Sequence, residues 1–562
     1  MSVVVEKSKE QIKDFILSAA KEAIKNGELE NAQLCDFSIQ VPAKRTNGDY
    51  AVNAAMVWSK ALKKAPRMIA EALVKNIDTK DSYIEKIEIA GPGFINIFLS
   101  DKYYADIVAD IDEKGENYGK SDYGKGKRML VEFVSANPTG PMHIGNARGG
   151  AMGDCLAAVL QAAGYETERE FYINDAGNQI NKFALSLDLR YKQLFCEGIE
   201  MPEDSYHGED IIAHAKAFAE INGDSFLQKS EEERRKALVE FALPKNIMGL
   251  KNDLLKYRIE YNTWFKESSL HESGETNRII ELLKESGYTY VSEDALWFKA
   301  TDFGCDKDFV LVRANGVPTY VVPDIAYHYN KLVTRGFDRA IDILGADHHG
   351  YVPRLKAALC ALGVDADRLD VVLMQMVRLV RGKEIIKASK RSGKAITLVT
   401  LLDEVPIDAA RFFFNLREPN SHFDFDLDLA VSESSNNPVY YVQYAYARIC
   451  SIVRNLSEQG IQKRKCTREE LELLKADEER ELITHLSAFT DEIILSAKTY
   501  DPAKMTHYVI ELATLFHKFY AACRVKCDDE ALCQARLTLC TDTATVIKNV
   551  LTMLKIEAPE KM

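Results

Sequence analysis

The spacing of apolar residues changes twice along this chain of 562 residues and divides it into three parts. Residues 1–118 mix helical spacing with short strand-like runs, and residues 119–436 alternate strands with helices. Residues 437–562 place apolar side chains at helical spacing only, enough for four or five helices. The pattern predicts a multidomain α/β protein with an N-terminal α+β module, a Rossmann-type parallel-sheet domain and an all-α C-terminal domain.

The N-terminal module contains predicted helices and predicted strands in alternation. Helical spacing is seen around residues 7–26 and 51–76, and strand-like runs occupy residues 37–41 and 84–100. The sequence Gly91-Pro92-Gly93 marks a turn inside the second run. This mixture is typical of a small, separately folded α+β unit.

The middle part begins with a strand-turn-helix-strand unit. A β-branched and aromatic strand at Val131–Ser135 leads through a Pro/Gly-rich turn into a small-residue helix at 144–164, and a second strand follows at 166–175. Such a unit should cross over right-handed. A polar, helix-rich block at about 177–290 interrupts the alternation, and strand signals resume at 309–322, 339–349 and 369–382. A parallel sheet with a long helical insertion is the simplest account.

Composition narrows the class of protein. Hydrophobic residues make up 46% of the chain and charged residues 28%, which is ordinary for a soluble globular protein. No apolar run reaches about 18 residues, and the N-terminus carries charges where a secretory signal needs an apolar core. The eleven cysteines form no CxxC pair, and we interpret Cys523 and Cys527 as buried or half-buried thiols rather than zinc ligands. We therefore expect a cytoplasmic protein without a membrane span.

The net charge of −13 argues against a nucleic-acid partner only at first sight. Binding follows the local potential of a surface, and an acidic protein can carry a basic groove. Composition therefore leaves the question of a nucleic-acid partner open.

The turn between the first strand and the small-residue helix carries candidate chemistry. It contains His143, Gly145 and Asn146 in the run His-Ile-Gly-Asn. Free backbone N–H groups and the helix dipole favour an anion at such a helix start, and Gly145 lets a polyphosphate approach the backbone. His143 and Asn146 are candidates to hydrogen-bond an ATP phosphate or ribose. For an isolated motif, a histidine that caps its own turn is the commoner interpretation.

A second, distant element is strongly basic, with Lys387, Ala388, Ser389, Lys390 and Arg391 in succession. A solvated basic loop is the plainest interpretation of such a run. The alternative is a mobile loop whose two lysines neutralise the polyphosphate while adenylation expels pyrophosphate.

Together the two elements resemble the two signatures of class I aminoacyl-tRNA synthetases, and the residues around them resemble arginyl-tRNA synthetases. The resemblance covers nearly the whole chain, in segments at residues 48–55, 63–73, 91–96, 172–180, 264–274, 314–328, 344–363, 423–430, 435–452 and 556–562. Two positions depart from the family pattern, because Asn146 replaces the usual second histidine and Ala388 the usual methionine. An amide still donates a hydrogen bond but carries no positive charge.

The resemblance implies an enzyme that ligates L-arginine to tRNA(Arg). In this reaction arginine and ATP, with Mg²⁺, form arginyl-adenylate and pyrophosphate, and the arginine then passes to the 3′-terminal adenosine of the tRNA. The N-terminal module would bind the tRNA elbow and the C-terminal helices the anticodon. We expect the enzyme to be a monomer.

The resemblance also implies which residues bind each substrate. ATP would be held by His143, Gly145, Asn146, Lys387, Ser389 and Lys390. His143 and the two lysines would be the catalytic groups, and no metal ligands are implied. Arginine would be held by Glu132, Asn137, Tyr320, Asp324 and His348. Carboxylates with hydroxyl or amide acceptors suit its planar, cationic fork of donors.

Some of these positions also have a plainer structural interpretation. Tyr320 and Asp324 lie four apart at the expected end of a strand, where Asp324 would serve as the N-cap of the next helix. His348 and His349 look like a metal pair, but neighbours on a strand point to opposite faces, so we expect no zinc there.

Two other functions stay open from the sequence. Another class I synthetase or a free nucleotidylyltransferase would share the phosphate turn, although the latter needs neither terminal domain. A catalytically silent tRNA-binding paralogue would have damaged signatures, and the substitutions at Asn146 and Ala388 are the features that favour it.

Overall fold

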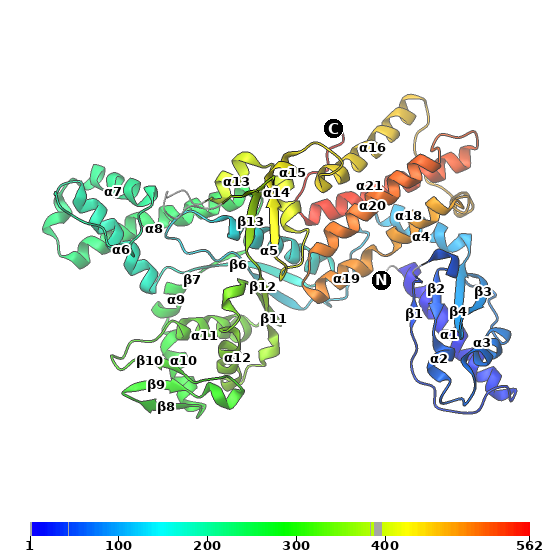
Figure 1. Ribbon diagram of the computed structural model, residues 1–562, viewed down its shortest axis with the longest axis horizontal. Helices are drawn as coiled ribbons and strands as arrows, with labels where there is room; N and C mark the ends of the chain where they lie inside the picture. Colours follow the sequence, from blue (N-terminus) through cyan, green and yellow to red (C-terminus); the bar gives the residue numbers. More distant parts are fainter. Residues whose placement is uncertain (1–2, 43, 383, 387–395) are drawn as a thin grey trace.

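The computed structural model describes residues 3–42, 44–382, 384–386 and 396–562. Figure 1 shows an elongated molecule with the parallel-sheet domain at its centre. The N-terminal module lies at one end beside the C-terminal helices, and the helical segment 177–256 extends at the other end. Within the described residues, no helix is both long enough and apolar enough to cross a membrane.

A five-stranded parallel sheet forms the centre of the molecule, with the strand order β12-β11-β5-β6-β7. Its strands are β5 (Arg128–Glu132), β6 (Glu166–Ile173), β7 (Thr263–Lys266), β11 (Arg339–Gly345) and β12 (Leu369–Met374). The winding direction reverses between β5 and β11, and ligands of such sheets bind beyond the carboxyl ends of the strands at that point. The predicted multidomain α/β fold is confirmed, and the reversal marks where to look for a site.

Helices cover both faces of this sheet, because strand residues are apolar on both sides. Val131 of β5 shares a buried cluster with α5 (Ile144–Ala162). Its neighbour Leu130 points to the other face and shares a cluster with α11 (Val321–Tyr329) and α12 (Val352–Ala361).

Helix α5 is rich in small residues because it lies very close to the sheet. A Cβ atom at Gly153 would come within 2.2 Å of Phe133 Cγ, and one at Gly150 within 2.8 Å of Ile259 Cδ1. Larger side chains would push the helix away from the strands. The glycines therefore fix where the N-terminus of α5 meets the sheet edge.

A helical arm and two small sheets flank the centre. The arm has its own buried cluster and comprises α6 (Gly177–Gln193), α7 (Glu209–Asn222) and α8 (Glu231–Lys256). Next come α9 (Glu267–Glu272), α10 (Glu275–Glu285) and an antiparallel sheet of β8 (Thr289–Ser292), β9 (Ala295–Phe298) and β10 (Phe309–Val312). The other sheet joins β13 (Val377–Arg381), β14 (Glu384–Ile385) and β15 (Phe423–Asp426), with α13 (Leu398–Glu404), α14 (Ile407–Phe414) and α15 (Leu427–Val431) nearby.

Several strand expectations were wrong in detail. The strand expected at Val131–Ser135 ends at Glu132, because Val134 and Ser135 adopt positive φ angles of 70° and 40° and turn the chain out of the sheet. The run at 369–382 divides into β12 and β13, which belong to different sheets. The expected insertion at 177–290 also contains β7, which extends the central sheet.

The run at 309–322 holds the difference that matters most for the site. Strand β10 ends at Val312, and helix α11 begins at Val321, so Tyr320 and Asp324 do not end a strand. The valines at 321 and 322 suggest a strand, but Pro323 in the first helical turn loses nothing, since the N–H groups there have no helical partner. Tyr320 is the N-cap of α11, and Asp324 lies inside its first turn.

The N-terminal module is the expected α+β unit. Its antiparallel sheet has the order β1-β2-β4-β3 and consists of β1 (Ile39–Gln40), β2 (Tyr50–Val52), β3 (Ile84–Ala90) and β4 (Phe94–Leu99). The helices are α1 (Val3–Lys25), α2 (Ala54–Trp58), α3 (Pro66–Lys75) and α4 (Asp101–Lys114). Helix α4 carries the module onto the C-terminal helices, where Asp101 pairs with Lys475 at 2.7 Å and Asp106 with Arg468 at 3.1 Å.

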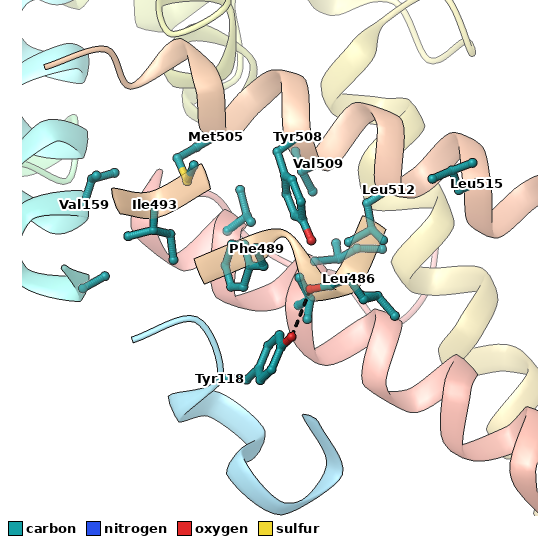
Figure 2. Packing of buried hydrophobic residues seen from close by; sticks show 14 of the residues in the cluster. Tyr118, Val159, Leu486, Phe489, Ile493, Met505, Tyr508, Val509, Leu512 and Leu515 are labelled. Atoms are coloured by element: carbon teal, nitrogen blue, oxygen red, sulfur yellow. Dashed lines mark hydrogen bonds between the residues drawn. The ribbon is translucent and has the colours of Figure 1, made fainter. Parts of the chain in front are cut away.

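The C-terminal part is all helical, as predicted, but has six helices rather than four or five. They are α16 (Pro438–Glu458), α17 (Arg468–Leu471), α18 (Asp477–Ser487), α19 (Phe489–Thr499), α20 (Ala503–Ala522) and α21 (Glu530–Met553). Figure 2 shows their core, in which Phe489 stacks on Tyr508 with ring centroids 5.1 Å apart. Tyr118, the last residue of the N-terminal module, donates a hydrogen bond to Leu486 O at 3.1 Å and ties the module to this core.

Buried Arg411 of α14 joins the central domain to the last helix. Its guanidinium donates to Asp154 Oδ2 on α5 at 2.6 Å, to Tyr257 O at 2.8 Å and to Leu554 O at 2.6 Å. One fully buried side chain thus satisfies three acceptors from three segments.

We expect Arg411→Met to lower the free energy of unfolding by about 3 to 5 kcal/mol, because it leaves buried acceptors without a donor. Urea denaturation followed by circular dichroism measures the change. Arg67→Met, which removes an exposed ion pair with Glu71, is the control and should cost less than about 1 kcal/mol. Equal effects of the two substitutions would contradict the role of Arg411.

Candidate active site

The N-terminus of α5 lies at the carboxyl edge of the sheet and is open to solvent. His143 is the N-cap, and its backbone N–H donates to Asn146 Oδ1 at 3.1 Å. Both His143 and Gly145 are exposed, and a Cβ atom at Gly145 would have no neighbour within 4 Å. The turn is therefore closed by the side chain of Asn146, while the backbone beside Gly145 leaves room for an anion.

The chain returns to this helix start directly after the basic element. His143 forms a β-bridge with Thr397, Ile144 N donates to Ile396 O at 3.2 Å, and Leu398 N donates to Met142 O at 3.0 Å. Lys387, Ser389 and Lys390 lie outside the described residues. The segment that follows them is nevertheless held against the His-Ile-Gly-Asn turn by main-chain hydrogen bonds.

Arg148 is a buried group in this region that the sequence analysis did not single out. It lies on α5 and donates to Gln375 O at 2.8 Å, Glu418 O at 2.9 Å and Ser421 O at 3.1 Å. Burial lowers the pKa of Arg148 to about 10, so the guanidinium stays charged at neutral pH. It therefore adds a positive charge near the start of α5 and ties that helix to the segments around β13 and β15.

A network of buried charges lies where the end of β5 pairs with the middle of β11. Glu132 of β5 accepts hydrogen bonds from Lys331 Nζ and, at 2.7 Å, from Ser135 Oγ. Asp342 of β11 accepts from Lys331 Nζ at 2.8 Å and from His328 Nε2 at 2.6 Å. Glu132, which the resemblance places in direct contact with arginine, is 7% exposed and contacts Lys331.

Lys331 reaches both carboxylates because α11 runs into a π-helical turn, Asn330–Thr334. The lysine side chain is completely buried. Burial lowers the pKa of Lys331, but Asp342 and Glu132 outweigh it and raise that pKa above its ordinary value, so the ammonium stays charged. Such one-turn widenings occur often at functional sites.

Glu132, His328 and Asp342 have the geometry of a metal-binding group, with ligand atoms within 4.8 Å of one another. The ammonium of Lys331 already contacts two of the three. We therefore interpret the cluster as neutralised by an internal cation instead of a metal.

The network reaches the protein surface through Asp324. His328 Nδ1 lies 3.2 Å from Asp324 Oδ1, and the side chain of Asp324 is 31% exposed. Burial alone would raise the pKa of Asp324, but the charge and hydrogen bond of His328 lower it below its ordinary value. Burial and Lys331 would lower the pKa of His328, yet Asp342 and Asp324 raise it to about 10.

The other predicted arginine ligands surround this carboxylate less tightly. Tyr320, one turn before Asp324, is 71% exposed and packs 5.8 Å from the ring of Tyr351. His348 is half exposed and lies in a short turn after β11, not on the strand itself. Asn137 is exposed on the loop after β5. In the described part of the chain, no hydrogen bond joins Asn137 or His348 to Asp324, so their assignment to a pocket stays a prediction.

Comparison with known proteins gives the family. Models described as "Arginyl tRNA synthetase N terminal domain", "tRNA synthetases class I (R), catalytic domain" and "DALR anticodon binding domain" match residues 9–99, 108–434 and 442–562. The chain belongs to the arginyl-tRNA synthetase family. Arginine–tRNA ligases of Caldanaerobacter subterraneus subsp. tengcongensis and Acetivibrio thermocellus are 54% and 52% identical to this synthetase over the whole of each chain.

Solved structures agree with the fold of this synthetase. The arginyl-tRNA synthetase of Thermus thermophilus matches with a TM-score of 0.74 at 20% identity, over 97% of this chain and 99% of that one. The family models and the relatives of more than 50% identity confirm the resemblance, and the site can be interpreted within a class I catalytic domain.

The charge network of the synthetase should make its stability depend on pH. Asp342 and Asp324 raise the pKa of His328 from an ordinary value of 6.5 to about 10 in the folded chain. Its contribution to the free energy of unfolding is therefore complete below about pH 6.5 and is lost as the pH rises through about 10. We expect the stability difference between the wild type and His328→Gln to shrink over that range.

Urea denaturation of both proteins at several pH values measures this difference. The control is His207→Gln, which replaces an exposed histidine and should follow the wild type at every pH. A difference that stays constant between about pH 6 and pH 10 would show that His328 is not protonated in the folded chain.

Proposed function

We propose that this synthetase is an arginine–tRNA ligase, which activates L-arginine with ATP and transfers it to the 3′-terminal adenosine of tRNA(Arg). The observation that carries the proposal is the charge balance beside Asp324. Three carboxylates, Glu132, Asp342 and Asp324, face two cations, Lys331 and His328. One negative charge remains, on the partly exposed carboxylate, and the guanidinium group of arginine supplies the missing positive charge.

The pocket assigns different roles to the predicted arginine ligands. Asp324 would accept hydrogen bonds from the guanidinium, and the exposed ring of Tyr320 would cover its face. Asn137 and His348 would contact the polar end of the substrate. Glu132 would act through Lys331, since that lysine stands between Glu132 and the other carboxylates.

ATP would bind at the open N-terminus of α5. The free backbone N–H groups near Gly145 would receive phosphate oxygens, with His143 and the amide nitrogen of Asn146 as further donors. Mg²⁺ would enter with the phosphates, because the one metal-like cluster among the described residues already contacts Lys331. Lys387, Ser389 and Lys390 would neutralise charge on the polyphosphate as pyrophosphate leaves.

Binding of tRNA would involve both ends of the chain. The module at 1–118 would bind the tRNA elbow and the helices at 437–562 the anticodon, and Figure 1 places these two parts side by side. On the helices, Arg448 lies over the half-exposed ring of Tyr444 at 4.6 Å, a pairing suited to unstacked bases. The catalytic domain would span residues 119–436, and we propose a cytoplasmic monomer.

Aminoacylation of bulk tRNA with each of the twenty amino acids, in the presence of ATP and Mg²⁺, tests the proposal. We expect charging with arginine only. Charging with another amino acid would contradict the interpretation of the charge balance. Folded protein that binds tRNA but charges nothing would favour a silent paralogue.

Asp324→Asn should raise the KM for arginine at least about a hundredfold, because it removes the charge that faces the guanidinium while preserving shape. Its kcat at saturating arginine should change much less. Asp204→Asn, at a side chain that is 72% exposed in the helical arm, is the matched control and should behave like the wild type. An unchanged KM in Asp324→Asn would remove this residue from the pocket.

A further inference from the structure

His328 is a buried ionisable side chain that the proposed reaction does not use directly. It lies one helical turn after Asp324 on α11 and is 4% exposed, so it cannot reach a bound substrate itself. Resting on the function proposed above, we propose that His328 is a positioning residue that holds the carboxylate of Asp324 in place for the guanidinium group of arginine.

The geometry connects Asp324 to the central sheet through the imidazole ring. On one side, Nδ1 lies 2.7 Å from Asp324 O and 3.2 Å from Asp324 Oδ1. On the other side, Nε2 lies 2.6 Å from Asp342 Oδ2 on β11. Only the protonated ring donates from both nitrogens. The orientation of Asp324 is thereby fixed by a strand of the sheet as well as by its own helix.

This support matters because recognition of a guanidinium depends on orientation. Two parallel N–H···O bonds form only when the carboxylate plane matches the plane of the fork. The carboxylate of Asp324 is 31% exposed, and a carboxylate at a helix start rotates freely unless another group holds it. The hydroxyl of Tyr351 also faces this carboxylate, but His328 contacts Oδ1 and is itself bonded to Asp342 of the sheet, so it limits rotation while part of the side chain stays open to a substrate.

The charged groups that face His328 favour the protonated form of its ring. Asp342 faces it from β11 and Glu132 from β5, with all ligand atoms within 4.8 Å, while Asp324 faces it from its own helix. Lys331, in the π-helical turn that follows α11, disfavours the charged ring. Lys331 is itself bound to Glu132 and Asp342, so three carboxylates outweigh one ammonium.

Two substitutions in the full-length chain separate the two sides of the ring. Asn places its amide nitrogen near the position of Nδ1 and keeps a donor toward Asp324. Gln places its amide nitrogen near the position of Nε2 and keeps only the donor toward Asp342. Steady-state aminoacylation with varied arginine, and separately with varied ATP, measures the effect, and His207→Gln is the matched control.

We expect His328→Gln to raise the KM for arginine about tenfold or more, with kcat at saturating arginine and the KM for ATP changed less than about threefold. His328→Asn should lie closer to the wild type. An unchanged KM for arginine in folded His328→Gln would overturn the proposal. Equal losses for arginine and ATP would also overturn it, because they indicate a general structural role.

A measurement on the wild type covers the case in which the variants fail to fold. With ¹⁵N-labelled histidine at about pH 8.5, ordinary histidines are neutral. We expect one ring protonated on both nitrogens, whose NMR signals shift when arginine is added. Absence of that signal, or a signal that does not shift when arginine is added, would overturn the proposal. Failure of the wild type to charge tRNA with arginine would instead contradict the proposed function. The NMR signal of His328 in the protein without arginine does not depend on that function, so the two failures can be told apart.

Discussion

The ammonium of Lys331 lies fully buried between Glu132 of β5 and Asp342 of β11, and a charge in such a place must be paired. This requirement holds the end of α11 against two strands of the central sheet. It also sets the charge that remains for a ligand to neutralise, because Lys331 and His328 together balance two of the three carboxylates in the network. Selection of a cationic substrate, as proposed above, would thus depend on charges shared among several elements instead of on one side chain.

The same edge of the sheet brings together elements that are distant in sequence. The start of α5 is bonded by its main chain to residues 396–398, and Arg148 binds carbonyl groups at Gln375, Glu418 and Ser421. A displacement of the segments around β13 and β15 would therefore also move the start of α5, where we propose that the polyphosphate binds. The helix start and these segments are thus bonded into one unit.

Periodicity was sufficient to predict the division into three parts, the βαβ unit and the small-residue helix, because these features depend on local spacing. It was insufficient at 309–322, where Val321 and Val322 suggest a strand and the chain instead begins α11. It also misplaced the end of β5, since the positive φ angles of Val134 and Ser135 have no signal in residues of those types. Asp324 was therefore expected at the end of a strand and lies on a helix.

The buried network had even less signal in the sequence. The resemblance predicted that Glu132 contacts the substrate. The residues around Glu132 in the sequence give no sign of its partner Lys331, which follows it by about two hundred residues. Lys331 itself resembles any lysine on a polar helix face. Its burial depends on the packing of α11 against β5 and β11 and on a local change of helical pitch. The spacing of apolar residues in the sequence predicts neither.

That change of pitch has a consequence for how the family can vary. A π-helical turn holds one residue more than an α-helical turn, so the turn at Asn330–Thr334 takes up one extra residue while the residues after it keep their direction. A regular α-helical path through the same residues would rotate those that follow by about 100°, and Arg335, which binds the buried Glu170 at 2.6 Å, would leave its partner. Surface loops tolerate gains and losses of residues, whereas a residue gained or lost at this turn would change the helix geometry between Lys331 and Arg335 and so disturb their ion pairs.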